Sequence, residues 1–267
     1  MTLPTPSSLA TVHTRIRSVR ADGLGVITLA RPEKQNALDQ RTAVELVEAL
    51  HELEASAEVR VIILEGDGDD FCTGADLAAL DATLESGIET HISDARALGT
   101  VFTTIREMSK PVVAIVRGRA IAGGAGLATA CDIVLAEETA QFGYPEVRIG
   151  FVPAMVMTML RRAVGEKRAA ELVLTGRLIG AAEAERIGLI SRCIPTGSFP
   201  LEVAKTLEAL VKAPPTAVGL TKRLLYRLDE LDFQESIGAG VSTNVESRAT
   251  EDFRAGVRHS LARARQS

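Results

Sequence analysis

Two glycine-rich turns in matching sequence contexts limit how this chain can fold more than any other feature. The first turn spans residues 66–77 and the second spans residues 118–127. Each follows a short β-branched run and leads into residues with helical spacing, which predicts a strand, a turn and a helix in that order. Such a turn leaves unpaired backbone N–H groups at the positive end of the helix dipole. One turn of this kind often only relieves a tight bend, but two can direct N–H groups at a single oxygen.

The segments around these turns predict an α/β fold. Strands are predicted at residues 12–19, 25–29, 59–65, 111–116 and 133–136. A helix is predicted to begin after Asp39, a residue typical of helix N-caps. Helices that alternate with strands indicate parallel strands joined by right-handed crossovers. The polar segment 81–97 has poor periodicity and predicts a mobile loop with a short helix over the site.

The strand signals stop near residue 200. Four helices are predicted beyond it, at residues 199–211, 216–228, 233–245 and 250–262. We therefore expect three parts: a flexible N-terminus rich in Pro, Ser and Thr (1–11), an α/β core (12–199) and a C-terminal helical region (200–267).

Composition and charge exclude several classes of function. The net charge of −5 argues against a nucleic-acid-binding surface. No segment reaches the length of a transmembrane helix, and the first ten residues lack the pattern of a secretory signal. The three cysteines and four histidines are scattered and match neither a metal site nor a disulfide framework. We therefore expect a cytoplasmic protein with no metal, no membrane partner and no nucleic-acid partner.

Several short segments in a fixed order carry a resemblance to a known family. They are residues 31–38, 71–77, 110–111, 118–132, 140–146 and 174–176. On these segments the chain resembles the crotonase superfamily, also called the enoyl-CoA hydratase/isomerase family, from about Val12 to Arg263. The resemblance implies an α/β, crotonase-like spiral of β-β-α repeats with a C-terminal helical trimerisation region. It also implies a homotrimer or homohexamer, and apolar residues of the last helices would supply part of the contact.

The resemblance also implies where a thioester oxygen would be held. The backbone amides of Ala75 and Gly123 are the expected donors to an oxygen that acquires enolate charge. Ala122 replaces the first glycine of the usual triplet, which is tolerable because the donors need only the turn geometry. The alternative is that both segments are packing turns, and their paired occurrence in matching contexts argues against it.

The proton-transfer residues depart from the usual pattern. Hydratases of the family carry two glutamates, at positions that correspond here to Gly126 and Glu146. A third position, which is an aspartate in the dienoyl isomerases and the dehalogenase branch, is Ala154 here. One carboxylate can move a proton between two carbons, whereas hydration in the usual enzymes divides the work between two. The pattern therefore favours a double-bond isomerase slightly over a hydratase, with Glu146 as the acid/base.

Other interpretations stay open from the sequence. An acidic residue of the long loop, namely Asp81, Glu85 or Glu89, could replace the missing glutamate. A decarboxylase or C–C lyase acting on a CoA thioester could also use one acid. The protein could instead be an acyl-CoA-binding protein whose catalysis has decayed. Glu146 itself could be a solvated loop carboxylate.

The resemblance places coenzyme A, as part of the substrate rather than a separate cofactor, along the edge of the first turn. The expected substrate-binding residues are Gln35, Ala37, Thr73, Asp76, Leu77, Gly124 and Tyr144. Tyr144 could equally serve packing, and Asn36 is better interpreted as a structural turn residue. Arg148 follows Glu146 by two residues, so an extended segment would point both side chains the same way. Arg148 would then bind a second acidic group of the substrate or form an ion pair at the surface or a subunit interface.

Overall fold

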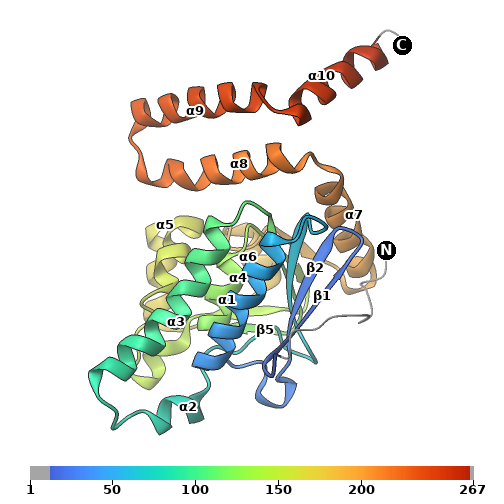
Figure 1. The fold of residues 1–267 in the computed structure, drawn as a ribbon. Helices are drawn as coiled ribbons and strands as arrows, with labels where there is room; N and C mark the ends of the chain where they lie inside the picture. Colours follow the sequence, from blue (N-terminus) through green and yellow to red (C-terminus); the bar gives the residue numbers. More distant parts are fainter. Residues whose placement is uncertain (1–12, 265–267) are drawn as a thin grey trace.

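The computed structural model describes residues 13–264, and its larger sheet has six strands (Figure 1). These are β1 (Ile16–Ala21), β2 (Leu24–Leu29), β3 (Val61–Gly66), β4 (Val112–Val116), β6 (Ile133–Glu137) and β9 (Arg192–Ile194). Their order in the sheet is β1-β2-β3-β4-β6-β9, with β1 antiparallel to β2 and every other pair parallel. The five predicted strands are confirmed with shifted ends, while residues 1–12 lie outside the described residues.

The first two strands form a hairpin whose turn explains their register. Asp22 and Gly23 both have positive φ, at 53° and 81°. Two such residues form the type of two-residue turn that matches the twist of a hairpin. The turn sets Ala21 opposite Leu24 and Ile16 opposite Leu29.

Both faces of the large sheet are buried, and the strand period of two separates them. On one face, residues such as Ile62 and Leu64 pack with α1 (Gln40–Ala55), α3 (Ile88–Glu107) and α4 (Gly123–Ala130). On the other face, Val61 and Ile63 pack with Phe199 and its neighbours on α7 (Phe199–Lys212). Buried parallel strands need apolar residues on both faces, which explains their continuous Val and Ile runs.

The helix predicted after Asp39 is confirmed as α1. The Asp39 Oδ1 atom accepts a hydrogen bond from the Thr42 backbone N–H at 2.7 Å, which caps the helix. Leu46, Leu50 and Leu53 form its buried face against the sheet.

A second sheet is built from three short strands, in the order β5-β7-β8. They are β5 (Arg119–Ile121), β7 (Gln141–Gly143) and β8 (Leu178–Gly180). Along the chain, β4, β5 and α4 form one β-β-α unit, and β6, β7 and α5 (Val156–Thr175) form the next. Each unit therefore adds one strand to each sheet and one helix, and α6 (Ala181–Arg186) follows β8.

The segment predicted to be a mobile loop is mostly helical, and that prediction is wrong. After the short helix α2 (Leu77–Ala82), the helix α3 extends over 20 residues, Ile88–Glu107. Only its second half faces the core, through Val101, Phe102 and Ile105. The first half is largely exposed, so residues 81–97 carry little of the apolar period that marks a helix.

Between β9 and residue 264, where the description ends, the chain forms only helices, close to the predicted positions. They are α7 (Phe199–Lys212), α8 (Pro215–Arg227), α9 (Phe233–Arg248) and α10 (Glu251–Ala264), besides short 3-10 turns. In Figure 1, α8 and α9 run antiparallel beyond the core and α10 extends away from them. Within residues 13–264, no helix is both long and apolar enough to cross a membrane.

A buried cation fixes α8 to the core. The Lys222 Nζ atom donates to the Ile105 carbonyl at 2.8 Å, to the Lys110 carbonyl at 2.9 Å and to Asp132 Oδ2 at 2.7 Å. The Tyr226 hydroxyl donates to the other oxygen of Asp132. The side chains of Lys222 and Asp132 are only 5% and 13% exposed, so water cannot replace this pairing.

Lys222→Met should lower the free energy of unfolding by about 3–5 kcal/mol, because it leaves Asp132 buried without its cation. Urea unfolding followed by circular dichroism measures the change. Lys212→Met is the matched control, since Lys212 pairs with Glu208 on an exposed helix surface and should change stability by less than about 1 kcal/mol. Equal losses in the two variants would contradict the anchoring role.

Candidate active site

A pocket of about 660 Å³ lies where the two glycine-rich turns meet. Four parts of the chain form its wall: the loop 33–37, the first turn with the start of α2, the second turn with Leu98 of α3, and residues 145–156. Most of its side chains are apolar, and the polar ones are few and specific, as in many small-molecule sites.

Backbone hydrogen bonds join the two turns to each other. Phe71 N–H donates to the Arg117 carbonyl and Cys72 N–H to the Arg119 carbonyl, both at 3.0 Å, and Ile121 N–H donates to Cys72 at 2.9 Å. The Arg119 guanidinium adds a two-point ion pair with Asp70, at 2.8 and 2.6 Å. The two turns therefore behave as one rigid unit.

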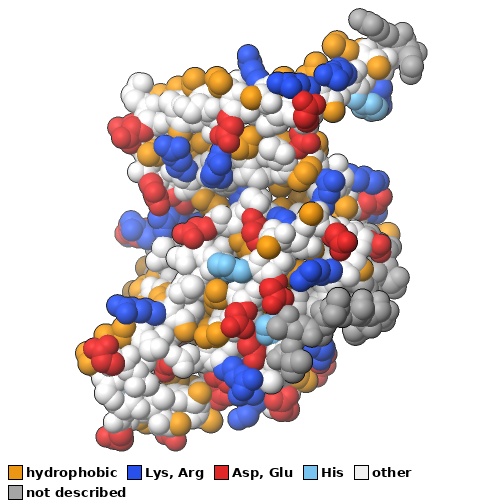
Figure 2. All heavy atoms as spheres, viewed as in Figure 1, with side chains coloured by type: hydrophobic (Ala, Val, Ile, Leu, Met, Phe, Trp, Pro, Cys, Tyr) orange, Lys and Arg blue, Asp and Glu red, His pale blue; other side chains and the backbone are white. Residues whose placement is uncertain are grey.

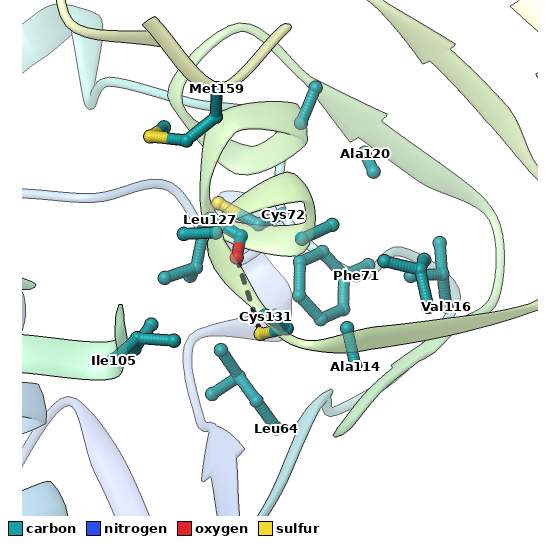
Figure 3. Close-up of a cluster of buried hydrophobic side chains, with 14 of the residues drawn as sticks. Leu64, Phe71, Cys72, Ile105, Ala114, Val116, Ala120, Leu127, Cys131 and Met159 are labelled. Atoms are coloured by element: carbon teal, nitrogen blue, oxygen red, sulfur yellow. Dashed lines mark hydrogen bonds between the residues drawn. The ribbon is translucent and has the colours of Figure 1, made fainter. Parts of the chain in front are cut away.

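Side chains of the first turn also pack directly on the helix that follows the second. Figure 3 shows Phe71 and Cys72 beside Leu127 and Cys131 of the α4 region. Complete burial raises the pKa of the Cys72 thiol to about 12, so this cysteine packs rather than reacts.

The amides of Ala75 and Gly123 are both in the pocket wall. Leu38 N–H donates to Gly74, and Asp76 N–H donates to Leu38, so the Ala75 N–H faces away from that pairing. Gly123 is the first residue of α4, where an N–H has no partner within the helix. In the described part of the chain, neither N–H has a hydrogen-bond acceptor. The site thus offers two free donors on adjoining turns.

Ala122 sits in a strained conformation between them. Its φ of 52° and ψ of −123° lie where glycine is comfortable and a β-carbon is not. Gly74, at φ 92°, must stay a glycine, since a β-carbon there would lie 2.8 Å from the Ala122 β-carbon. Alanine in place of the usual glycine at position 122 is therefore tolerated, as expected, but its backbone conformation is strained.

Glu146 is the carboxylate that the pocket leaves unpaired. It lies in a 3-10 turn, η2 (Pro145–Ile149), and is 8% exposed. Its Oε2 atom is buried and has no hydrogen-bond partner among residues 13–264. Burial raises the pKa of Glu146 above its ordinary 4.5. It is therefore not a solvated loop carboxylate.

Within the described wall, Glu146 has no second buried and unpaired carboxylate beside it. A β-carbon on Gly126 would lie 2.2 Å from Val156 Cγ1 and 3.3 Å from Phe102, so helix packing fills that position. The loop acids proposed as replacements, Asp81, Glu85 and Glu89, are exposed and do not line the pocket. Of the other wall acids, Asp76 is paired with Arg31 and Glu33 is exposed.

The predicted substrate-binding residues divide into two groups. The structure places Gln35, Ala37, Thr73, Asp76 and Leu77 in the pocket wall. Gly124 and Tyr144 are absent from the described wall. A β-carbon on Gly124 would lie 2.1 Å from the Cys72 carbonyl oxygen, so this glycine permits close packing. Tyr144 is fully buried, with its hydroxyl 3.1 Å from Thr129 Oγ1, so its role is packing.

Asn36 is buried and adopts a left-handed φ of 56°, as a turn residue does. Its side-chain amide donates to the carbonyls of Asp67 and Asp70, both at 2.8 Å, and its side-chain oxygen accepts from the Arg31 N–H. It therefore ties the loop 31–37 to the first turn.

Arg148 does not follow an extended segment, because residues 145–149 form a 3-10 turn. Its side chain is exposed, and it lines the pocket without an ion-pair partner in the described residues. The prediction that it points the same way as Glu146 rested on the wrong local structure. Sequence reasoning also missed Leu98, Phe151 and Val152 as wall residues. The available signal was the pair of adjacent apolar residues after Gly150, and the structure leaves both of them exposed.

Comparison with known proteins identifies the family. A family model described as enoyl-CoA hydratase/isomerase matches residues 20–264. The chain is 44% identical over 236 residues to a putative enoyl-CoA hydratase of Thermus thermophilus, covering 88% of this chain and 93% of that protein. It is 32% identical over 235 residues to the short-chain-enoyl-CoA hydratase of Clostridium acetobutylicum, covering 86% and 87%. Human enoyl coenzyme A hydratase domain-containing protein 3 has the same fold, with a TM-score of 0.90, 28% identity and coverage of 94% and 98%.

Ala122→Gly should raise the free energy of unfolding, because glycine removes strain of about 1–3 kcal/mol at this φ and ψ. The extra freedom of glycine in the unfolded chain offsets about 0.4–1 kcal/mol of that gain. Ala125→Gly on the same helix, which has no strain to relieve, is the control and should destabilise. A loss of stability in both variants would show that Ala122 is not strained.

Gly126→Glu alone should destabilise the protein by about 1–3 kcal/mol or more, because the new side chain collides with Val156. Adding Val156→Ala should recover part of that loss by removing the Cγ1 atom. Thermal unfolding of the two variants and of Val156→Ala alone separates the effects. Additive losses in the double variant would mean that the two positions do not share space.

Proposed function

Since this chain belongs to the enoyl-CoA hydratase/isomerase family, we infer that it stabilises a thioester enolate between the amides of Ala75 and Gly123 and uses Glu146 to move the proton. The observation that carries this proposal is the buried Glu146 carboxylate, whose Oε2 atom has no hydrogen-bond partner among the described residues, in the wall that holds the two free N–H groups. A buried ionisable group with a raised pKa in a pocket is typical of catalytic acids and bases.

The proposed chemistry begins with an acyl-CoA whose thioester oxygen accepts from both amides. Glu146 removes a proton from carbon, and the electron pair moves toward the thioester oxygen. Donors fixed by the fold stabilise that charge without the reorganisation that water would need. The positive end of the α4 dipole, at Gly123, acts in the same direction.

Among the reactions of the family, the proposal slightly favours migration of a double bond. Glu146 would then return its proton to a second carbon of the same allylic system. Ala154, Met155 and Val156 make the neighbouring wall apolar, so little there could hold or activate a water molecule. The alternative is water addition, the activity for which the Thermus and Clostridium relatives are named. Decarboxylation or C–C cleavage on the same enolate is the further alternative.

A panel of 2-enoyl and 3-enoyl thioesters of coenzyme A tests the proposal. Isomerisation changes the thioester absorbance without changing product mass, whereas hydration adds the mass of one water. Isomerisation of a 3-enoyl substrate as the fastest reaction is the expected result. If hydration were the faster reaction, the protein would be a hydratase rather than an isomerase. No turnover across the panel would favour an acyl-CoA-binding protein.

Glu146→Gln should lower turnover by about 10²–10⁴-fold, the usual contribution of general acid–base catalysis. In the wild type, kcat/KM should rise with pH through an apparent pKa above 4.5, because the base must be ionised and burial raises its pKa. That rise should be absent from the residual activity of the variant. The control is Glu89→Gln, which removes an exposed carboxylate outside the described wall and should keep wild-type turnover. A loss of turnover in this variant would instead place the base on the loop.

We also propose that the protein assembles as a trimer or a dimer of trimers through its C-terminal helices. Phe233, Ile237, Val241 and Val245 form a stripe at four-residue spacing on α9, and each is 54–75% exposed. Figure 2 shows hydrophobic side chains along α9 and α10. An intramolecular cap would have covered these residues, and a second chain can do so at roughly 25 cal/mol per Å² of apolar area.

Light scattering at micromolar concentration should therefore return three or six times the 28.4 kDa chain mass. Ile237→Lys combined with Val241→Lys should shift the mass toward the monomer, because charges on the stripe cannot be desolvated in an interface. Gln234→Lys lies on α9 outside the stripe and should leave the mass unchanged. A monomeric wild type would overturn the assembly.

A further inference from the structure

Arg31 is a buried cation that touches two separate segments of the pocket wall. It is 7% exposed. Its Nη1 atom donates to the Ala37 carbonyl at 2.8 Å, and its Nη2 atom donates to Asp76 Oδ2, also at 2.8 Å. Its two nitrogens therefore hold the loop before α1 against the first glycine-rich turn.

The two segments held by Arg31 are those that orient the Ala75 amide. Leu38 N–H donates to the Gly74 carbonyl at 2.7 Å, and Asp76 N–H donates to the Leu38 carbonyl at 2.8 Å. These two bonds flank Ala75 and turn its N–H away from Leu38. Arg31 binds Ala37, the neighbour of Leu38, and Asp76, the neighbour of Ala75.

The guanidinium also connects the starts of two helices. Asp76 Oδ1 accepts from the Ala78 N–H at 3.0 Å and caps α2, while Asp39 caps α1 and lies 3.2 Å from Arg31 Nη1. Arg15 also pairs with Asp39, at 3.1 Å, but within residues 13–264 its side chain forms no hydrogen bond or ion pair with Ala37 or Asp76. Of these two cations, therefore, only Arg31 reaches the turn that carries Ala75.

We propose that Arg31 is a positioning residue for catalysis: by clamping Ala37 to Asp76 it fixes the direction of the Ala75 N–H that binds the thioester oxygen. This inference rests on the proposed function of that amide. Arg31 does not touch the reacting atoms itself. A lysine can keep the charge but has no planar fork with which to bridge both acceptors.

The test is the infrared carbonyl band of bound butanoyl-CoA carrying ¹³C at the thioester carbon. In the wild type, hydrogen bonds from Ala75 and Gly123 should lower the band frequency relative to the free thioester. Arg31→Lys should lose a large part of that shift and lower kcat on the best panel substrate by about 10-fold or more, as loss of one oxyanion donor costs about 10²–10³-fold. The dissociation constant of coenzyme A without an acyl group should change much less.

Arg15→Lys is the matched control, because it perturbs the same Asp39 without reaching Ala37 or Asp76, and it should keep the wild-type band. Asp76→Asn keeps an acceptor for Arg31 and the helix cap, and should give an intermediate shift if Arg31→Lys does not fold. A folded Arg31→Lys variant with the wild-type band and kcat would overturn the positioning role. A wild-type protein whose bound carbonyl is unshifted would instead overturn the proposed function, and this inference with it.

Discussion

The backbone hydrogen bonds between residues 71–72 and 117–121 are the contact on which the remaining site depends. They bring together two turns that each end a strand of the large sheet, and they place Gly74 directly against Ala122. Two glycines report this close approach of backbones: a β-carbon on Gly74 would lie 3.0 Å from the Ile121 carbonyl oxygen, and one on Gly124 would lie 2.1 Å from the Cys72 carbonyl oxygen. The N–H groups of Ala75 and Gly123 take no part in the hydrogen bonds between the turns, so they stay free in the wall of the pocket.

The carboxylates in and beside the pocket differ in whether a cation pairs with them. Asp76 is neutralised by Arg31, and this hydrogen bond holds the pKa of Asp76 below its usual range. Asp70 is likewise paired with Arg119. Glu146 has no such partner in the described chain, and its pKa moves the opposite way because burial dominates. The pKa values of these three carboxylates therefore differ because of their neighbours: pairing lowers the pKa at Asp70 and Asp76, and burial raises it at Glu146.

Local signals predicted much of the fold. Asp39 caps α1 as its residue type indicates, and the C-terminal helices follow their apolar spacing. What failed depended on long-range packing. Residues 81–97 looked irregular because only the later half of α3 meets the core. Tyr144 and Gly124 lie beside wall residues in sequence, yet Thr129 and Cys72 from other elements hold them in the interior. The turn that redirects Arg148 is instead a local feature, with Pro145 at its start and Gly150 at its end, which the spacing of Glu146 and Arg148 alone did not predict.

The burial of Glu146 has a thermodynamic consequence for the folded state as a whole. A carboxyl whose pKa is raised by folding binds its proton more tightly in the native protein than in the unfolded chain. Its contribution to stability is therefore full below the unfolded value of 4.5 and is lost as pH rises through the folded value. At neutral pH the ionised side chain favours unfolding, so the rest of the fold must outweigh the cost of keeping this carboxylate in the pocket wall.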